Sequence, residues 1–207
     1  MDTKQRIRKE ALTLFAEKGY HAVYVGEIAE AVGIKAPSLY KHYKSKQDIF
    51  DAILDEMKDH YDKQAAALQF SGSDPAGDVS VFAGVSEDTL VQMGIGLFRF
   101  FLHDDDTSKF RKMLTIEQFH DGELARLFSQ QYVDGPLSYQ SALFGLLAAG
   151  GAFREGKADV MALHFYGPIY LLLTVCDRQP EREEEALRLI EAHIRQFNGL
   201  YTREKNK

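Results

Sequence analysis

The sequence predicts an all-α protein with two parts, a three-helix head that contains a helix-turn-helix and a larger helical body. Apolar residues recur at intervals of three and four along most of the chain, and no stretch after the head alternates with strand-like chemistry. Residues 1–47 hold nine Lys or Arg against five Asp or Glu, whereas residues 48–207 hold sixteen against twenty-six. We therefore expect a basic domain at 1–47 and an acidic domain at 48–207.

The head is predicted to contain two helices before its turn. The first spans about Thr3 to Lys18 and ends at Gly19, and the second has an apolar stripe at Val25, Ile28, Ala29 and Val32. Gly33 can adopt the left-handed backbone of a sharp helix end, and Pro37 suits the first turn of the next helix. This order of signals predicts a helix-turn-helix.

The short helix after the turn has an apolar side, at Leu39 and Tyr43, and an outer side of small or hydrogen-bonding residues. The outer residues are Lys35, Ala36, Ser38, Tyr40, Lys41 and His42. Such groups can enter a major groove or meet phosphates. The alternative is a two-helix corner with a solvated basic face.

The body is predicted to be a series of helices joined by short loops. A bridging helix runs from about Lys46 to Leu68 after a Ser45 cap, and Phe70 to Asp78 forms a loop rich in Gly, Ser, Asp and Pro. Further helices are expected at Glu87–His103 after a Ser86 cap, at about Thr107–His120, from near Gly122, and at about Pro136–Ala149.

The last two predicted helices carry apolar residues at a 3,4 repeat. One series is Val160, Leu163, Gly167, Tyr170 and Thr174, and the other is Leu187, Ile190, Ile194, Phe197 and Tyr201. Such a series packs helices at a shallow angle. Both series can serve as a dimer interface or as the core of one subunit.

Three stretches resemble the N-terminal domain of the TetR family of transcriptional regulators: ALTLFAEKGY, IAEAVGI and SLYKHYKSKQDIF. The resemblance covers about residues 4–54. Val23 and Tyr24 stand where the family usually has Ser or Thr, and Lys35 stands where it often has Ser, so the usual side-chain N-caps are absent. The resemblance implies a homodimeric repressor that binds a palindromic operator in double-stranded DNA and responds to a ligand.

The resemblance also implies roles for individual residues. Base-edge contact is expected from Lys35, Ala36, Pro37 and Ser38, and phosphate contact from Tyr40, Lys41, His42 and Lys46. The two 3,4 series would form a four-helix dimer interface. An unidentified small apolar or aromatic ligand would occupy a pocket in the middle of the body, for which we name Met93, Leu97, Phe119, Phe144, His164 and Tyr166.

Other classes of protein find little support. The sequence has no GxSxG, GxxxxGK[ST], HExxH or CxxC motif, so no enzyme, cofactor or metal site is predicted. The apolar run Leu163–Cys176 is shorter than the roughly 20 residues of a membrane span, and the N-terminus has no signal segment. We expect a cytoplasmic protein with a buried, reduced Cys176.

Two alternative functions remain open at this stage. One is a helical small-molecule-binding protein whose basic head makes only nonspecific DNA contacts. The other is a protein-interaction module that uses its terminal helices with a different partner.

Overall fold

The computed structural model describes residues 1–68 and 70–203, and this part of the chain consists of helices joined by turns and loops, with one isolated bridge between Phe153 and Thr202 and no strand. The predicted all-α class is confirmed. The chain divides into two compact units, and both are discontinuous in sequence. The first unit comprises Met1–Tyr61 and Asp104–Ser129, and the second comprises Asp62–His103 and Gln130–Lys207.

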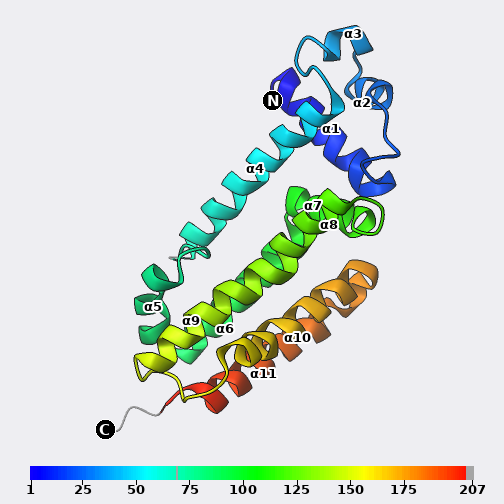
Figure 1. Ribbon diagram of the computed structural model, residues 1–207. Helices are drawn as coiled ribbons and strands as arrows, with labels where there is room; N and C mark the ends of the chain where they lie inside the picture. The colour runs from blue at the N-terminus through cyan, green and yellow to red at the C-terminus, as the bar shows by residue number, and fades with distance from the viewer. Residues whose placement is uncertain (69, 204–207) are drawn as a thin grey trace. The chain divides into compact units, whose positions relative to one another are not determined.

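The first unit contains the head and two later helices (Figure 1). Its elements are α1 (Thr3–Lys18), α2 (Val25–Val32), α3 (Ala36–Leu39), most of α4 (Lys46–Ala67), α7 (Asp105–Glu117) and α8 (Gly122–Ser129). Helix α1 packs against α2 and α7. The fully buried apolar side chains include Ile7, Ala11, Phe15, Ile28, Leu39, Ile49, Met113 and Leu114. The compact unit thus extends beyond the domain predicted at 1–47, whose boundary stays a prediction.

Local sequence signals set several helix ends. Asp2 and Gln5 form a reciprocal capping box at the start of α1, and Gly19 ends this helix at a φ of 85°. The Ser45 hydroxyl accepts a bond of 3.0 Å from the Asp48 N–H, and the Ser86 hydroxyl accepts one of 3.2 Å from the Thr89 N–H. Both predicted serine caps are therefore confirmed.

The second unit contains α5 (Pro75–Gly84), α6 (Glu87–His103), α9 (Gly135–Ala149), α10 (Ala158–Arg178) and α11 (Glu183–Tyr201). It also contains a π-helix, η1 (Gln130–Asp134), and a 3-10 turn, η2 (Pro180–Arg182). Helix α9 packs against α5 and α10, and α6 packs against α10 and α11. One core cluster includes Phe98, Cys176 and Ile190, and a second includes Phe144, Phe153 and Phe197.

The predicted loop from Phe70 to Asp78 is partly wrong, because α5 begins at Pro75 and includes Asp78 in its first turn. The Asp78 carboxylate is buried and accepts bonds from the Ser71 N–H at 2.7 Å, the Gly72 N–H at 3.1 Å and the Tyr139 hydroxyl at 2.6 Å. Burial opposes ionisation of Asp78, but these hydrogen bonds outweigh it and lower its pKa. The Asp78 carboxylate therefore links the loop residues Ser71 and Gly72 to Tyr139 of α9 through hydrogen bonds.

Among the described helices, α10 is long and apolar enough to cross a membrane by length and composition alone. The helix is longer than the predicted apolar run Leu163–Cys176, because it begins at Ala158, continues through Pro168 and ends at Arg178. Met161, Ala162, Leu173 and Cys176 lie buried on its inner side. Burial also raises the pKa of the Cys176 thiol, as expected for an unreactive core cysteine.

Candidate nucleic-acid interface

The turn between α2 and α3 has the geometry that the sequence predicts. Gly33 has a φ of 75° in the left-handed region, the Ile34 N–H bonds the Ala29 carbonyl, and the Gly33 N–H bonds the Glu30 carbonyl. This pair of bonds is the Schellman pattern, which closes a helix end. An added Cβ at Gly33 would meet no atom within 4 Å, so the backbone angle alone calls for glycine.

Helix α3 presents most of the predicted DNA-contacting residues on one side. Leu39 and Tyr43 are buried, whereas Lys35, Pro37, Tyr40, Lys41 and His42 are exposed and Ala36 and Ser38 are half-buried. Seven of the eight predicted residues therefore lie together around one short helix with basic and hydrogen-bonding groups directed to solvent. Tyr24, at the start of α2, adds a ring that is 74% exposed and that the sequence argument did not assign to the interface.

Lys46 differs from the other seven, because its ammonium binds the protein's own backbone. The Nζ atom donates to the Tyr20 carbonyl at 2.8 Å and the Val23 carbonyl at 2.9 Å, and it lies 4.4 Å from the centre of the Tyr20 ring. Burial lowers the pKa of Lys46. These bonds give Lys46 a structural role, in which α4 holds the loop between α1 and α2, while its contact with phosphate stays a prediction.

The same loop is bound from its other side by α7. The buried Glu117 carboxylate accepts a bond of 3.1 Å from the His21 N–H, and the His21 ring lies 2.9 Å from the Asp121 carboxylate. A Cβ at Gly19 would lie 2.6 Å from Glu117 Oε1, and the positive φ of Gly19 also disfavours a side chain. Lys46 and Glu117 together fix the loop that leads into α2.

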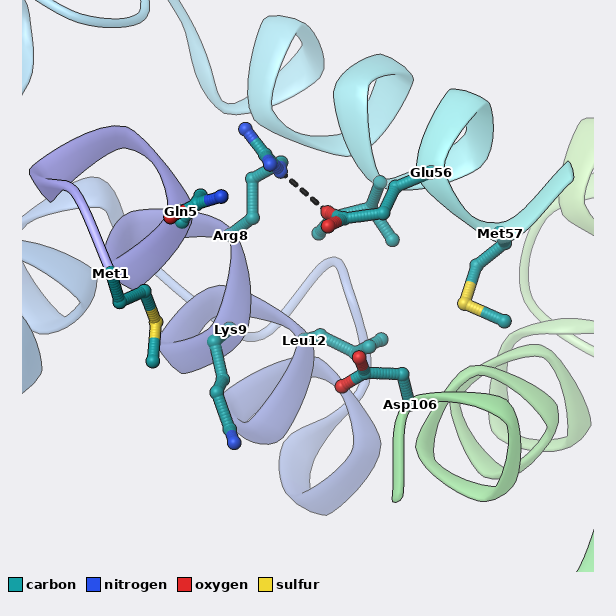
Figure 2. Close-up of a pocket in the computed structure, with 9 residues that line it drawn as sticks. Met1, Gln5, Arg8, Lys9, Leu12, Glu56, Met57 and Asp106 are labelled. Atoms are coloured by element: carbon teal, nitrogen blue, oxygen red, sulfur yellow. Dashed lines mark hydrogen bonds and ion pairs between the residues drawn. The ribbon is translucent and has the colours of Figure 1, made fainter. Parts of the chain in front are cut away.

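A cavity of about 260 Å³ lies in the first unit where α1, α4 and α7 meet (Figure 2). Apolar groups from Leu12, Ile53 and Met57 share it with the ion pair between Arg8 and Glu56, whose atoms are 2.6 Å apart. The Arg8 guanidinium also donates to the Tyr43 hydroxyl, so it is already engaged. None of the six predicted ligand-binding residues lines this cavity.

The predicted ligand-binding residues are distributed over both units. Met93, Leu97, Phe144, His164 and Tyr166 belong to the second unit, whereas Phe119 belongs to the first and is 81% exposed. Phe144 is a core residue, and the Tyr166 hydroxyl donates to the Tyr132 carbonyl at 2.8 Å. An exposed ring cannot wall an enclosed pocket, so the structure does not support Phe119 in this role.

The terminal helices require a correction to the predicted dimer residues. Ile190, Ile194 and Phe197 of α11 are at most 1% exposed within the subunit, so they cannot contact a partner. On α10, Val160 and Leu163 are exposed, and Gly167, Tyr170 and Thr174 are half-buried. Leu187 and Tyr201 are half-buried, and the exposed positions of α11 are instead Glu184, Arg188, Leu189, Ala192, Gln196, Gly199 and Leu200.

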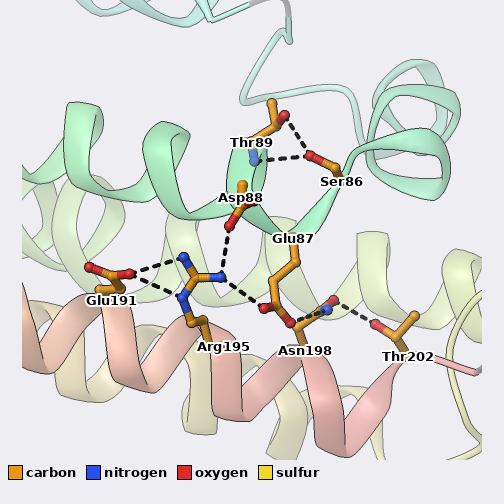
Figure 3. A network of polar contacts seen from close by, with 8 residues as sticks. All are labelled: Ser86, Glu87, Asp88, Thr89, Glu191, Arg195, Asn198 and Thr202. Atoms are coloured by element: carbon orange, nitrogen blue, oxygen red, sulfur yellow. Dashed lines mark hydrogen bonds and ion pairs between the residues drawn. The ribbon is translucent and has the colours of Figure 1, made fainter.

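Polar residues of α11 join this helix to α6 beside the inward-facing 3,4 series (Figure 3). The Arg195 guanidinium binds Glu87 at 2.9 Å and Asp88 at 2.8 Å, both in the first turn of α6, and the Asn198 amide donates to Glu87 at 2.9 Å. These contacts flank the buried apolar series and join α11 to α6. The 3,4 series of α11 is therefore subunit core.

The fold and the exposed face of α3 define a helical protein with an N-terminal helix-turn-helix. Residues 7–53 match the family described as "Bacterial regulatory proteins, tetR family". The biofilm operon negative transcriptional regulator IcaR of Staphylococcus aureus is 46% identical over 48 residues, which are 23% of this chain and 26% of IcaR. The match thus spans about a quarter of the length of this relative.

Solved structures extend the similarity in fold to the whole chain. A putative transcriptional regulator from Saccharomonospora viridis in complex with choline is 20% identical, covers 97% of this chain and 98% of its own, and has a TM-score of 0.67. The fatty acid degradation regulator FadR from Bacillus halodurans is 19% identical, covers 96% of both chains, and has a TM-score of 0.64. Residues 7–53 are thus similar to the DNA-binding domain of TetR-family regulators, and the chain shares the fold of these solved structures.

Proposed function

We propose that this protein is a cytoplasmic DNA-binding transcriptional regulator, a repressor that binds a palindromic operator as a homodimer and is released by a small hydrophobic or aromatic effector. The observation that carries the proposal is the TetR-type helix-turn-helix, with α3 presenting Lys35, Ser38, Tyr40 and Lys41 beside a closed, glycine-dependent turn. No catalytic role is proposed.

Within this function, the residues around α3 divide into two groups. Lys35, Ala36, Pro37 and Ser38 contact base edges, because the start of the second helix of a helix-turn-helix enters the major groove. Tyr40, Lys41 and His42 hold phosphate and set the register. Lys46 contributes indirectly by fixing the loop before α2. Binding to any duplex weakens steeply with salt, because each phosphate contact releases counterions.

The partner that we propose for the exposed side of α10 and α11 is a second copy of this chain. Val160, Leu163 and Leu171 form an exposed apolar stripe on α10, and a Cβ at Gly167 would meet no atom within 4 Å. Leu189 and Leu200 are the exposed large apolar residues of α11. A twofold dimer through these positions presents two recognition helices, which suits a palindromic site.

The effector acts by stabilising a form of the dimer whose two recognition helices no longer match the half-site spacing. To move most of the protein off its operator, the effector must favour the released form by about 3–5 kcal/mol. The contacts of Glu117 and Asp121 with the loop residue His21 support a route by which α7 influences α2. The similar structures share only the fold, so the effector itself stays unidentified.

The test is a competitive selection from random duplex DNA, at fixed near-physiological salt, with the purified chain and no added ligand. An enriched palindrome with half-sites one helical turn or a multiple apart is the expected result. If no sequence is enriched, the helical small-molecule-binding protein becomes the better description. A solution mass equal to one chain, or a complex with a different protein, would favour the interaction module.

A further inference from the structure

A π-helix interrupts the helical segment that joins the two units. The segment begins as α8, changes to η1 at Gln130–Asp134, and continues as α9 from Gly135. We call residues Gln130–Asp134 the π-turn. A π-turn adds a residue to the ordinary helical repeat, and such turns are rare and occur frequently at functional sites.

The sequence after the π-turn opposes a regular α-helix. A Cβ at Gly135 would collide with the Gln130 carbonyl oxygen, so the residue that closes this turn must lack a side chain. Pro136 has no N–H, and in an α-helix the Tyr132 carbonyl would need a donor four residues later, at Pro136. The Gly-Pro pair therefore accommodates the π-turn and leaves the Tyr132 carbonyl without its α-helical donor.

A side chain from α10 provides a donor to this carbonyl. The Tyr166 hydroxyl donates to the Tyr132 carbonyl at 2.8 Å, and the Tyr166 ring stacks on Tyr170 with centroids 5.8 Å apart. Tyr132 itself is 2% exposed, and its ring meets the Phe101 ring of α6 edge to face at 6.4 Å. The π-turn is thus held by α10 through its backbone and by α6 through its side chain.

We infer that Tyr166 is a positioning residue for operator binding, because its bond to Tyr132 holds the π-turn through which α8 continues into α9. This inference rests on the proposed function. Successive residues of an α-helix are rotated by about 100°, so gain or loss of the extra residue changes the helical register at the π-turn by about this angle. Helix α8 leads back to α7, whose Glu117 binds the loop before α2.

The inference also defines a chemical requirement for an effector that acts at this position. A ligand must present a hydrogen-bond acceptor to the Tyr166 hydroxyl, since only an acceptor competes with the Tyr132 carbonyl for this donor. The bond to the carbonyl and the bond to the ligand are then mutually exclusive states of one hydroxyl group.

The experiment compares the wild type with Tyr166→Phe, Gly135→Ala and the double variant. Gly145→Ala on the same helix α9 is the matched control, because its added Cβ would meet only Ala158 at an ordinary 3.7 Å. Hydrogen exchange over residues 130–137 reports on the π-turn itself. Affinity is measured for the selected palindrome and for the same palindrome with a lengthened spacer.

Tyr166→Phe removes one oxygen atom, so we expect the chain to fold and exchange over residues 130–137 to accelerate about tenfold. Operator affinity should fall by about fivefold or more, because fewer molecules present the competent arrangement. The preference for the native spacer should also shrink, which a general loss of stability would not cause. The double variant should be no weaker than the weaker single variant, since both changes act on one element.

The inference would be overturned if Tyr166→Phe kept the affinity and the spacer preference of the wild type. It would also be overturned if the loss of operator affinity in the double variant equalled the product of the losses in the two single variants. If the wild type selects no palindrome, the proposed function fails and the coupling to DNA fails with it. The exchange measurement distinguishes the two failures, because it reports whether Tyr166 holds the π-turn without any DNA present.

Discussion

Replacing Lys46 by Met tests whether this residue is structural or binds phosphate. Methionine keeps an unbranched stem of similar length and removes the ammonium group, which makes bonds of 2.8 and 2.9 Å to the Tyr20 and Val23 carbonyls. A hydrogen bond from a charged donor contributes about 1.5–3 kcal/mol net. The contact with the Tyr20 ring adds about 0.5–1 kcal/mol.

The sum overstates the loss, because His21 and Ala22 are exposed and water can reach part of this loop. We therefore expect Lys46→Met to lower the free energy of unfolding by about 2–4 kcal/mol. Urea unfolding of the first unit, followed through its tyrosines, measures this change. Lys44→Met is the matched control, because the Lys44 side chain is exposed two positions away, and it should change stability by less than about 0.5 kcal/mol.

Salt-dependent binding to the selected palindrome gives the decisive comparison. Lys41→Ala should reduce the slope of log affinity against log salt by about 1, as expected when one phosphate contact is lost. Lys46→Met should leave this slope unchanged. Unchanged stability together with a slope reduced by about 1 would refute the structural role and restore Lys46 as a phosphate contact.

Three further predictions concern other parts of the chain. The ionised Asp78 carboxylate stabilises the folded protein above about pH 4, and the wild type loses this stability as pH falls through the lowered pKa of Asp78. Asp78→Asn should therefore be less stable than the wild type above about pH 4, and the acid unfolding curves of the two proteins should converge at low pH. Leu171→Glu should convert the dimer to single chains in sedimentation, whereas Leu146→Glu on α9 should not. Tyr40→Phe should weaken binding to all duplexes by a similar factor, whereas Ser38→Ala should change the selected half-site; equal behaviour of the two variants would contradict their assigned roles.

Helix positions were predictable wherever a cap and an apolar period agreed. Gly19, Gly33, Ser45 and Ser86 each mark a helix end because their backbone or side-chain chemistry acts over one turn, without help from the rest of the chain. Helix α5 was missed for the converse reason. Pro75 and its neighbours have loop composition, and the buried Asp78 gains its partners only from tertiary structure.

The residues around α3 could be predicted from the sequence, but the intramolecular partners of the charged side chains could not. Sequence spacing places Lys35, Tyr40 and Lys41 around one helix, but it cannot reveal that the Lys46 ammonium returns to a backbone loop more than twenty residues earlier. The 3,4 series of α11 fits a core and an interface equally, and only the burial of Ile190, Ile194 and Phe197 within the subunit decides between them. Likewise, Pro136 was interpreted as a helix start, although it continues a helix through a π-turn.

The discontinuous first unit has a consequence for the order in which the protein folds during synthesis. Residues 1–61 leave the ribosome well before α7, yet Phe110, Met113 and Leu114 of α7 are buried in the folded chain, and α7 packs on α1. About forty further residues must therefore be synthesised before α7 can pack on the nascent DNA-binding segment. A chimera that exchanges residues 1–47 between relatives would separate Gly19 and His21 from their matching Glu117, so a functional exchange should carry α7 with it.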